Sequence, residues 1–237
     1  MKKLLSVIIS LSLIIGTLAM FSSCEEKEED IKNFEYTTIE GGIEITKYLG
    51  NSKKVVVPSV IDNKKVISIT DTTFSGNIVL EEITLPEYLD IYFDSKLLKG
   101  CDSLKTINVL CPVWSFACPI LPALETINFS KVTTSTLSSM NWDHYFDYCS
   151  LLCNINIQEF TTVPSISSWY DALSGESQFF EKRTINFVIP EDTLEEIYKK
   201  YPDNTNNSIC EIFGCSNLTV NGTSYSYQGT YKNSNFN

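Results

Sequence analysis

The sequence predicts a mainly β fold in which short strands stack as the coils of a solenoid. Three observations predict it. A short apolar motif recurs along the chain, runs of β-branched residues stop at Gly, Pro or Asn, and no strong helical period spans 11 residues before residue 190. With 43% apolar residues among 237, the chain is too hydrophobic to be disordered. It is long enough for one domain, or two small ones, with a sizeable core.

The charge of the chain argues against one class of partner. The sequence holds 18 Lys+Arg against 29 Asp+Glu and a single histidine, which gives a formal net charge of -11. Nucleic-acid phosphates are bound mainly by Lys and Arg. We therefore expect no nucleic acid among the partners.

Residues 1–23 have the features of an export signal. A basic start precedes an uncharged apolar run, 4–20, which is short for a membrane span. Two serines then stand before Cys24, and this ending resembles a bacterial lipobox. The resemblance implies a lipoprotein signal peptide over 1–23, lipidation of Cys24 and a lipid anchor in a bacterial membrane. A plain secretory signal or an uncleaved anchor is the alternative.

An acidic tether is expected over 24–33. Its carboxylates are Glu25, Glu26, Glu28, Glu29 and Asp30. Because like charges repel one another, we expect this stretch to be extended and solvated. An acidic stretch at this place resembles the surface-export signal of lipoproteins in Bacteroides-type bacteria. This resemblance favours the outer membrane, facing the cell exterior, over the periplasmic face.

A β-hairpin is predicted at the start of the fold. A β-rich run, 36–39, leads into a Gly41-Gly42 pair, and apolar residues then alternate over 43–48. We expect this hairpin to form the N-terminal cap. A further β-branched run, 54–57, stops at Pro58.

The recurring motif is Leu-x-x-Ile-x-Φ, where Φ is a large apolar residue. Its copies span 80–85, 104–109, 124–129, 152–157 and, in degenerate form beginning with Lys182, 182–187. The central isoleucines are 24, 20, 28 and 30 residues apart, a spacing typical of a leucine-rich repeat solenoid. One coil cannot bury its Leu, Ile and Φ alone, so the coils share one core. The uneven spacing predicts insertions, mainly over 130–145 and 158–181.

The residues before the strands lengthen the motif to Φ-x-Gly-Cys-x-x-Leu-x-x-Ile-x-Φ. Residues 98–109 fit this pattern in full, and 74–85 and 146–157 fit it in part. The pattern resembles the BspA-like leucine-rich repeat family of bacterial surface lipoproteins. The resemblance covers 34–201, with caps included, and implies a right-handed solenoid. It also implies adhesion to host matrix or cell-surface proteins, or to other bacteria.

A helix and a hairpin are predicted as the C-terminal cap. Asp192 or Thr193 can cap a helix that runs to Tyr201. Residues 202–237 then hold an Asn-Gly hairpin signal, over 218–227, and a frayed tail.

Seven cysteines remain once Cys24 is assigned to the lipid. Cys101 and Cys149 share one repeat position, where a small thiol packs like an apolar residue, so both are expected as buried free thiols. Two further pairs lie in loops and can be disulfides or free: Cys111 with Cys118, and Cys210 with Cys215. Cys149 and Cys153 lack further soft ligands nearby, so we expect no zinc and no other cofactor.

No catalytic constellation stands out, and we expect a protein that is not an enzyme. The single histidine, His144, has neither a nucleophile elbow nor a glycine-rich phosphate loop beside it. A surface hydrolase is the third hypothesis behind the two binding functions given below.

The residues that flank each central isoleucine are expected on the outer face of the sheet. They are Glu82 and Thr84, Thr106 and Asn108, Thr126 and Asn128, Asn154 and Asn156, and Thr184 and Asn186. Stacking predicts two polar ladders, with Asn186 continuing the row of Asn128 and Asn156. Neighbouring amides satisfy each other in such ladders, and a polar recognition face is the alternative.

Aromatic side chains near the insertions are the candidate binding residues, because exposed aromatics anchor protein and sugar partners. They are Trp114, Trp142, Trp169 and Tyr170, with Tyr145 beside them. Packing inside the coil is the alternative for each. The sequence favours a surface-anchored adhesion protein that binds an extracellular protein or cell-surface receptor. A glycan-binding surface lipoprotein for nutrient capture is the alternative.

Overall fold

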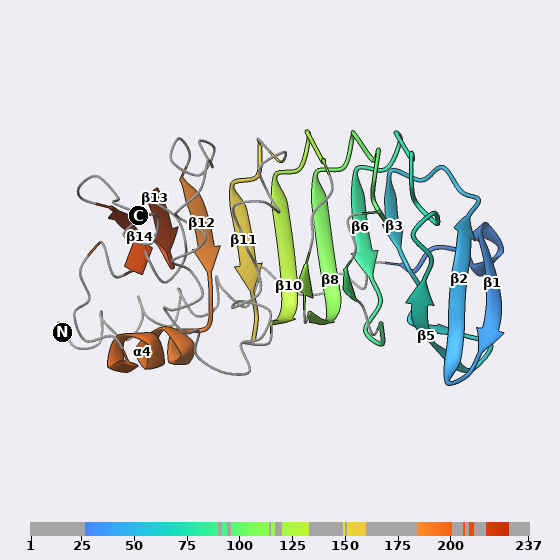
Figure 1. The fold of residues 1–237 in the computed structure, drawn as a ribbon, viewed down its shortest axis with the longest axis horizontal. Coiled ribbons are helices and arrows are strands. Elements are labelled where there is room, and N and C mark those ends of the chain that lie inside the picture. The colour runs from blue at the N-terminus through green and yellow to red at the C-terminus, as the bar shows by residue number, and fades with distance from the viewer. Residues whose placement is uncertain are drawn as a thin grey trace, which may run out of the picture.

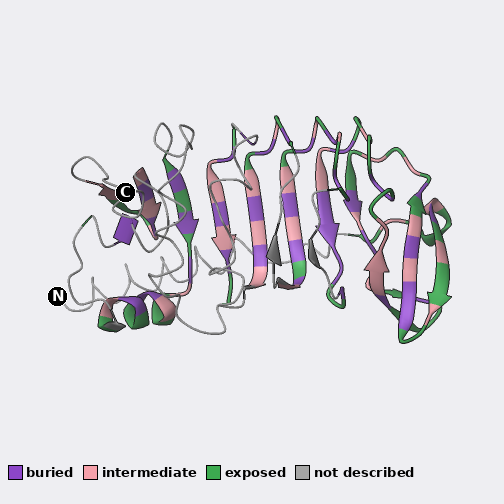
Figure 2. Cartoon of the chain, in the orientation of Figure 1, coloured by how far each residue is buried: buried purple, intermediate pink, exposed green. Residues whose placement is uncertain are grey.

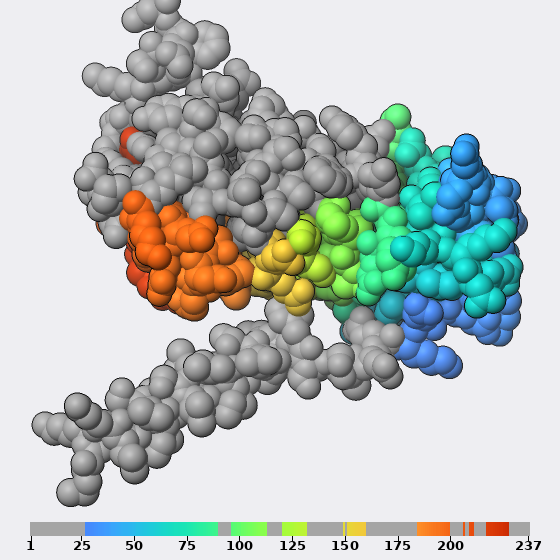
Figure 3. All heavy atoms as spheres, turned by 90° about the horizontal axis from the view of Figure 1, so that it is seen from below, coloured from blue at the N-terminus to red at the C-terminus, as the bar shows by residue number. Residues whose placement is uncertain are grey.

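The structure is a computed structural model of the whole chain. It describes residues 27–89, 92–93, 96–113, 115–116, 120–132, 149, 151–159, 184–200, 206, 209–210 and 217–227. The described elements follow one another along the long axis of the molecule, from the N-terminal hairpin to the C-terminal helix and hairpin, in sequence order except that strand 64–69 lies before strand 54–56 (Figures 1 and 3).

A four-stranded sheet, in the order β1-β2-β5-β4, forms the N-terminal end. Its elements are η1 (Ile31–Asn33), β1 (Phe34–Ile39), β2 (Gly42–Tyr48), β4 (Val60–Ile61) and β5 (Lys64–Ile69). β1 and β2 pair antiparallel as the predicted hairpin. β4 and β5 form a second hairpin, whose turn residues Asp62 and Asn63 have φ of 50° and 61°. Positive φ at both turn positions suits a tight hairpin, and Asp and Asn tolerate it better than most residues. The hairpin of β4 and β5 was not among the predicted elements.

An eight-stranded sheet, in the order β14-β13-β12-β11-β10-β8-β6-β3, runs along the rest of the molecule. Its strands are β3 (Lys54–Val56), β6 (Glu82–Leu85), β8 (Thr106–Val113), β10 (Thr126–Val132), β11 (Asn154–Ile157), β12 (Ile185–Val188), β13 (Asn217–Val220) and β14 (Thr223–Ser226). Neighbours from β3 to β13 pair in parallel. The predicted mainly β stack of strands is therefore confirmed, whereas its right-handed sense stays a prediction.

A small parallel pair, β7 (Tyr92–Phe93) with β9 (Ser115–Phe116), lies outside the large sheet. β7 follows β6 and β9 follows β8, so these two adjacent coils pair a second time after the chain leaves the large sheet. The two long strands β8 and β10 also remain paired beyond the motif, as far as Val113 and Val132.

The core contains the apolar rows that the motif predicts. Ile83, Ile107, Ile127 and Ile155 pair strand to strand and are each 0% exposed, so their predicted burial and stacking are confirmed. Val55 of β3 extends this row by one strand. Figure 2 shows the result as alternating buried and half-buried positions along the strands. This alternation is the pattern expected of a sheet with one face in the core.

The turns before the strands also repeat, even where the motif does not. Leu104 N donates to Cys101 O at 3.0 Å, and Leu124 N donates to Leu121 O at 3.1 Å. The thiol of Cys101 is free and fully buried, as predicted, and its Sγ lies 3.2 Å from Phe74 O. Leu121 occupies the equivalent place in the third coil and is equally buried. A larger apolar residue therefore substitutes for the cysteine without changing the turn.

The fifth strand pairs in a frame two residues away from the prediction. Asn186 stands opposite Asn154, and not beside Asn156 in the second ladder. Its N–H donates to Cys153 O at 2.9 Å, just as Asn154 N donates to Glu125 O in the coil before. The prediction that Asn186 continues the row of Asn128 and Asn156 is therefore wrong.

Burial explains this shifted frame. Phe187 enters the isoleucine row opposite Ile155. Ile185, two residues earlier on the same face of the strand, stands opposite Leu218 of β13. Ile185 and Phe187 are 0% and 2% exposed, and Ile189 beyond them is 4% exposed. The predicted frame would place Lys182 in the buried leucine row, where an unpaired lysine is costly. A shift of two residues avoids this cost and leaves every side chain on the same face.

The C-terminal hairpin lies where it was predicted, whereas the helix begins at Glu191, so Asp192 and Thr193 lie in its first turn and not at its cap. Helix α4 (Glu191–Lys200) buries Leu194 and Ile197, and Tyr198 on it contacts Tyr225 of β14 through their hydroxyls at 2.7 Å. Burial and this hydrogen bond raise the pKa of Tyr198. β13 and β14 turn at Asn221, whose side chain hydrogen-bonds both N and O of Ile189 at 2.9 Å. β13 is also the next parallel strand of the large sheet, so the sheet continues past α4.

The described part of the acidic segment, 27–33, lies against the domain. Glu29 N donates to Val56 O at 2.9 Å, and Glu28 Oε1 accepts from Ser59 N at 3.2 Å. The like charges of this segment predict a solvated, extended tether here. Charge repulsion does not prevent docking, because the contacts are made through a backbone N–H and a single carboxylate. Among the described residues, no helix is both long and apolar enough to span a membrane.

Candidate functional site

The side chains chosen from the sequence as binding residues lie outside the described residues. They are Trp114, Trp142, Trp169 and Tyr170, together with Tyr145, His144 and the lipidation site Cys24. The site can therefore be built only from the outer face of the eight-stranded sheet. This face carries the two polar rows that flank the isoleucine row.

The second polar row is a continuous chain of amides. Asn156 Nδ2 donates to Asn128 Oδ1 at 2.6 Å, and Asn128 Nδ2 donates to Asn108 Oδ1 at 2.6 Å. Asn108 Nδ2 in turn donates to Thr84 Oγ1 at 3.0 Å and to Glu82 Oε1 at 3.3 Å. The predicted bonding of neighbouring amides along the sheet is therefore confirmed for these strands. We call Asn108, Asn128 and Asn156 the amide ladder.

Glu82 fixes the direction of the amide ladder. An ionised carboxylate can only accept hydrogen bonds, so Asn108 must turn its NH2 group toward Glu82 and its oxygen toward Asn128. The same choice then passes to Asn128 and Asn156, each of which donates to the strand before it. Lys54 holds Glu82 in place through an ion pair of 2.5 Å. One carboxylate on β6, next to the edge strand β3, thus orients amides as far as three strands away.

The ladder has an open end at β11. On β12 the position opposite Asn156 is Val188, which is 44% exposed and offers no donor. Among the described residues, none donates to Oδ1 of Asn156. A half-buried acceptor and an exposed apolar side chain therefore stand next to each other on the sheet face.

The first polar row is looser and ends in the same region. Asn154 Nδ2 lies 3.4 Å from Thr126 Oγ1 and 3.2 Å from Cys153 Sγ. Asn186 Nδ2 donates to Asn154 Oδ1 at 3.2 Å, and Asn186 is the exposed member of the row. We call Asn156, Asn186 and Val188 the open end. Its members come together only because β12 pairs in the shifted frame.

The opposite end of the sheet face is charged. Glu81 accepts from Lys53 at 2.5 Å and from Lys105 at 3.2 Å, and both contacts hold its pKa below the usual range, Lys53 more strongly. Because these side chains are solvated, each ion pair contributes little to stability. These ion pairs link adjacent coils just before β6 and β8.

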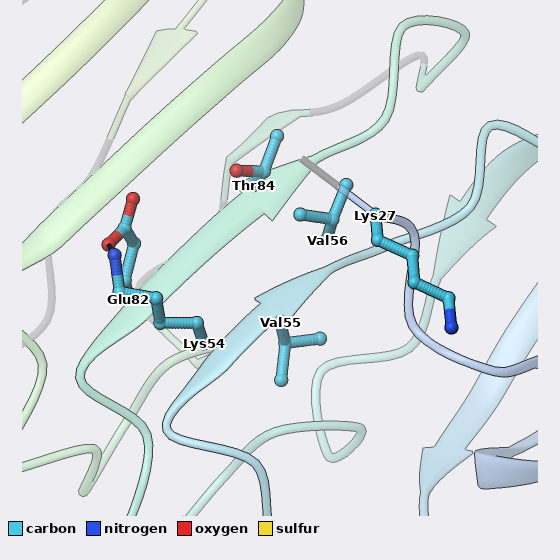
Figure 4. Close-up of a pocket in the computed structure, with 6 residues that line it drawn as sticks. All are labelled: Lys27, Lys54, Val55, Val56, Glu82 and Thr84. Carbon is cyan, nitrogen blue, oxygen red and sulfur yellow. Dashed lines mark ion pairs between the residues drawn. The ribbon is translucent and has the colours of Figure 1, made fainter. Parts of the chain in front are cut away.

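A shallow pocket of about 200 Å³ lies at this charged end. Figure 4 shows its lining on β3 and β6, with Lys27 of the acidic segment crossing beside Val56. The lining residues are Lys27, Lys54, Val55, Val56, Glu82 and Thr84. Lys54 and Glu82 neutralise each other across it, so the pocket offers a short apolar floor but no unpaired acidic group. No sequence motif marks this pocket, because Lys27 reaches it only through the docking of residues 27–33.

The described thiols are placed for packing. Burial raises the pKa of Cys101 to about 11 and that of Cys111 to about 12, so neither is a thiolate at neutral pH. Cys111 is free and buried, and Cys118 lies outside the described residues. Within the part of the chain that the structure describes, no three His, Cys, Asp or Glu side chains group as metal ligands.

Comparison with known proteins identifies no family for this chain. No protein-family model matches it, and no curated protein matches it. The crystal structure of a leucine-rich repeat protein from T. pallidum is 18% identical and covers 73% of this chain and 95% of its own, with a TM-score of 0.37. A likeness at this TM-score carries no argument, so the fold rests on the strand register given above.

Proposed function

We propose that the chain is a lipid-anchored binding protein of the bacterial surface, which acts without a catalytic step of its own. Its stacked coils serve as a rigid frame that presents side chains to an extracellular protein or a cell-surface receptor. Adhesion to host matrix or cell-surface proteins is the proposed role. The right-handed coil and the outer-membrane location are parts of the same proposal.

The observation that carries the proposal is the open end of the sheet face. Within the amide ladder the polar side chains bond to one another, so they need no ligand. Asn156 and Asn186 present unsatisfied amide groups beside exposed Val188. A polar group next to a small apolar surface is the usual composition of a protein-binding contact.

The chain connections support the same location. One insertion follows β10 and the other follows β11, so both are joined in sequence to the strands around the open end. Trp142 lies in the first and Trp169 and Tyr170 lie in the second. We propose that these aromatics are the anchors of the interface, with Trp114 as a further candidate. Aromatic anchors with an amide rim are typical of protein interfaces.

A glycan is the alternative partner, and one feature favours it. The groups left free at the open end are uncharged amides, which donate to and accept from sugar hydroxyls equally well. Exposed aromatics also stack on sugar rings. The same surface would then serve nutrient capture by a surface lipoprotein.

Binding measurements on the mature chain test the proposal. The chain from Glu25 onward is immobilised and exposed to purified matrix proteins and, separately, to a glycan array. We expect saturable binding to a protein, and substitution Trp169→Ala or Trp142→Ala should weaken it about tenfold or more, as loss of an aromatic anchor does. Asn128→Ala is the matched control, because Asn128 lies within the satisfied part of the ladder.

Three results would change the proposal. Binding to glycans alone selects the alternative. Loss of binding in Asn128→Ala, with stability unchanged, moves the site from the insertions to the sheet face. Release of the unmutated, signal-cleaved protein from membranes without detergent contradicts the anchor, whereas Cys24→Ala should move the protein into the soluble fraction.

A further inference from the structure

The acidic segment is attached to the fold as soon as the structure describes it. Glu29 N–H donates to Val56 O on β3, which is the edge strand of the large sheet. Glu28 holds the N–H of Ser59, and Glu29 Oε1 accepts from Asn33 at 2.5 Å. The segment therefore covers the sheet edge and is fixed at both ends.

The reach between the anchor and the docked segment is short. Two residues stand between Cys24 and Lys27, and the three extended residue steps between their Cα atoms cover at most about 11 Å. The polar layer of one bilayer leaflet is itself roughly 5–8 Å thick. A lipid on Cys24 therefore holds the β3 edge close to the headgroups and does not let the domain move away freely.

Three exposed residues form a surface beside the docked segment. Val60 follows Ser59 directly and pairs with Lys65 across β4 and β5. Lys65 Nζ lies 4.1 Å from the centroid of the Tyr88 ring. Val60 and Tyr88 are 45% and 37% exposed. A valine, a lysine on a long stem and a tyrosine with a polar tip together suit the membrane–water interface.

The charge distribution gives the molecule a neutral end and an acidic end. Between residues 27 and 65 there are seven lysines and seven acidic residues. From residue 66 to residue 237 there are nine Lys+Arg against twenty Asp+Glu. With Glu25 and Glu26 of the acidic tether included, the first part has a net charge of −2 and the second −11, so anionic lipids repel the second part more strongly. The neutral end is also the end that carries the docked segment.

From these four observations we infer that the N-terminal end of the solenoid rests on the phospholipid bilayer, with Val60, Lys65 and Tyr88 as its lipid-contact patch. The inference rests on the lipid anchor of the proposed function and adds an orientation to it. The β3 edge is proximal to the membrane, and the open end of the sheet face points away from it. The binding surface is thereby presented to partners from outside.

Lysine acetylation on vesicles tests this orientation. The full lipidated protein is reconstituted into vesicles of phosphatidylethanolamine and phosphatidylglycerol, and the lipid-free chain from Glu25 is the reference. Site-resolved mass spectrometry follows the acetylation of exposed Lys64 and Lys65 and of exposed Lys199 on α4. We expect Lys64 and Lys65 to react about threefold more slowly on vesicles, because the interface restricts access to them. Lys199 should react at an unchanged rate.

Variants separate the patch from the anchor. Val60→Glu places a carboxylate in the patch and should restore the acetylation of Lys65 on vesicles. Leu151→Glu, at a residue 54% exposed before β11, is the matched control and should not. If the ratio of the rate on vesicles to the rate in the lipid-free chain is the same for Lys65 and Lys199, and the acylated N-terminal peptide is detected, the orientation alone is overturned. Absence of that acylated peptide overturns the anchor, and the orientation with it.

Discussion

The coils of β6, β8 and β10 and the coils of β11, β12 and β13 share one parallel sheet but establish its register in different ways. In the first group the motif copies align residue for residue, as Ile83, Ile107 and Ile127 show. In the second group the isoleucine row continues through Phe187, which is the Φ and not the Ile of its motif copy, and through Val220, which lies outside the motif copies. Register therefore follows the burial of apolar side chains, and the repeated motif is one way to achieve that burial.

The outer faces of the two groups differ as well. In the first group, Glu82, held by Lys54, accepts from Asn108 and so satisfies the last donor of the amide ladder. In the second group the rows end in open amide groups beside Val188. The coils of the second group, which we call the irregular coils, thus combine a well-packed core with polar groups on the surface that lack protein partners among the described residues. A binding site needs both features.

Removal of a row-filling side chain in the irregular group should have the largest effect. Phe187→Ala is expected to lower the free energy of unfolding by about 3–5 kcal/mol, and Ile107→Ala in the regular group by about 2–5 kcal/mol. Both side chains are almost fully buried in the same row. Urea denaturation of the two variants measures the difference.

A neighbouring residue provides the control for that comparison. Val188→Ala changes an exposed side chain on the other face of β12 and should alter the free energy of unfolding by no more than about 0.5 kcal/mol. A cost below about 1 kcal/mol for Phe187→Ala would contradict the shifted frame, since a buried phenylalanine cannot be lost so cheaply.

The sequence was sufficient for the rows of the core and insufficient for the frame of the fifth strand. Leu80, Ile107 and Phe129 could be assigned because their spacing repeats and their alternation has a period of two. The same alternation cannot distinguish a shift of two residues, because it leaves each side chain on its own face. The shift at Phe187 therefore required the partner strand to be known.

The functional surface was predictable only in part. The bonding of Asn108 to Asn128 followed from strand spacing, whereas the open end at Asn156 depends on the shifted frame. The docking of residues 27–33 was missed because charge patterns describe side chains, and Glu29 is held through its backbone N–H. The pocket beside Lys27 was missed for the same reason.

Two turn glycines of the regular coils should give the next largest effect. Gly76 and Gly100 have φ of 75° and 77°, a region that costs an alanine about 1–2 kcal/mol. A Cβ on Gly100 would also lie 3.3 Å from Gly76 Cα, whereas a Cβ on Gly76 meets nothing within 4 Å. Gly100→Ala should therefore destabilise the protein by about 2 kcal/mol or more, and Gly76→Ala by about 1 kcal/mol. Thermal unfolding of both variants would show whether the stacked turns are as rigid as this contact requires.

The amide ladder should respond more weakly. Asn128→Ala removes one hydrogen bond to Asn108 and one from Asn156, and we expect a loss of about 1 kcal/mol because the side chain is only half-buried. Asn156→Ala removes one bond at the open end and should cost about half as much. Equal losses in urea denaturation would mean that Asn156 has a partner that the open-end interpretation does not include.

The smallest effect should come from the ion pairs of Glu81 with Lys53 and Lys105, which lie in the regular coils. The bonds from Lys53 and Lys105 lower the pKa of Glu81 in the folded state, so Glu81 favours folding when it is ionised. This contribution is present above the unfolded pKa of about 4.3 and is lost as the pH falls through the lower folded value. A double-mutant cycle of Glu81→Gln and Lys53→Met should therefore show a favourable coupling at pH 7 that shrinks toward zero as the pH falls below the lowered folded pKa. The coupling should also weaken at 1 M salt, because both side chains are solvated. A coupling that persists in acid and in high salt would show that Lys53 and Glu81 stabilise the coils through packing of the lysine side-chain carbons. The charges of these residues in the regular coils would then have no effect on stability.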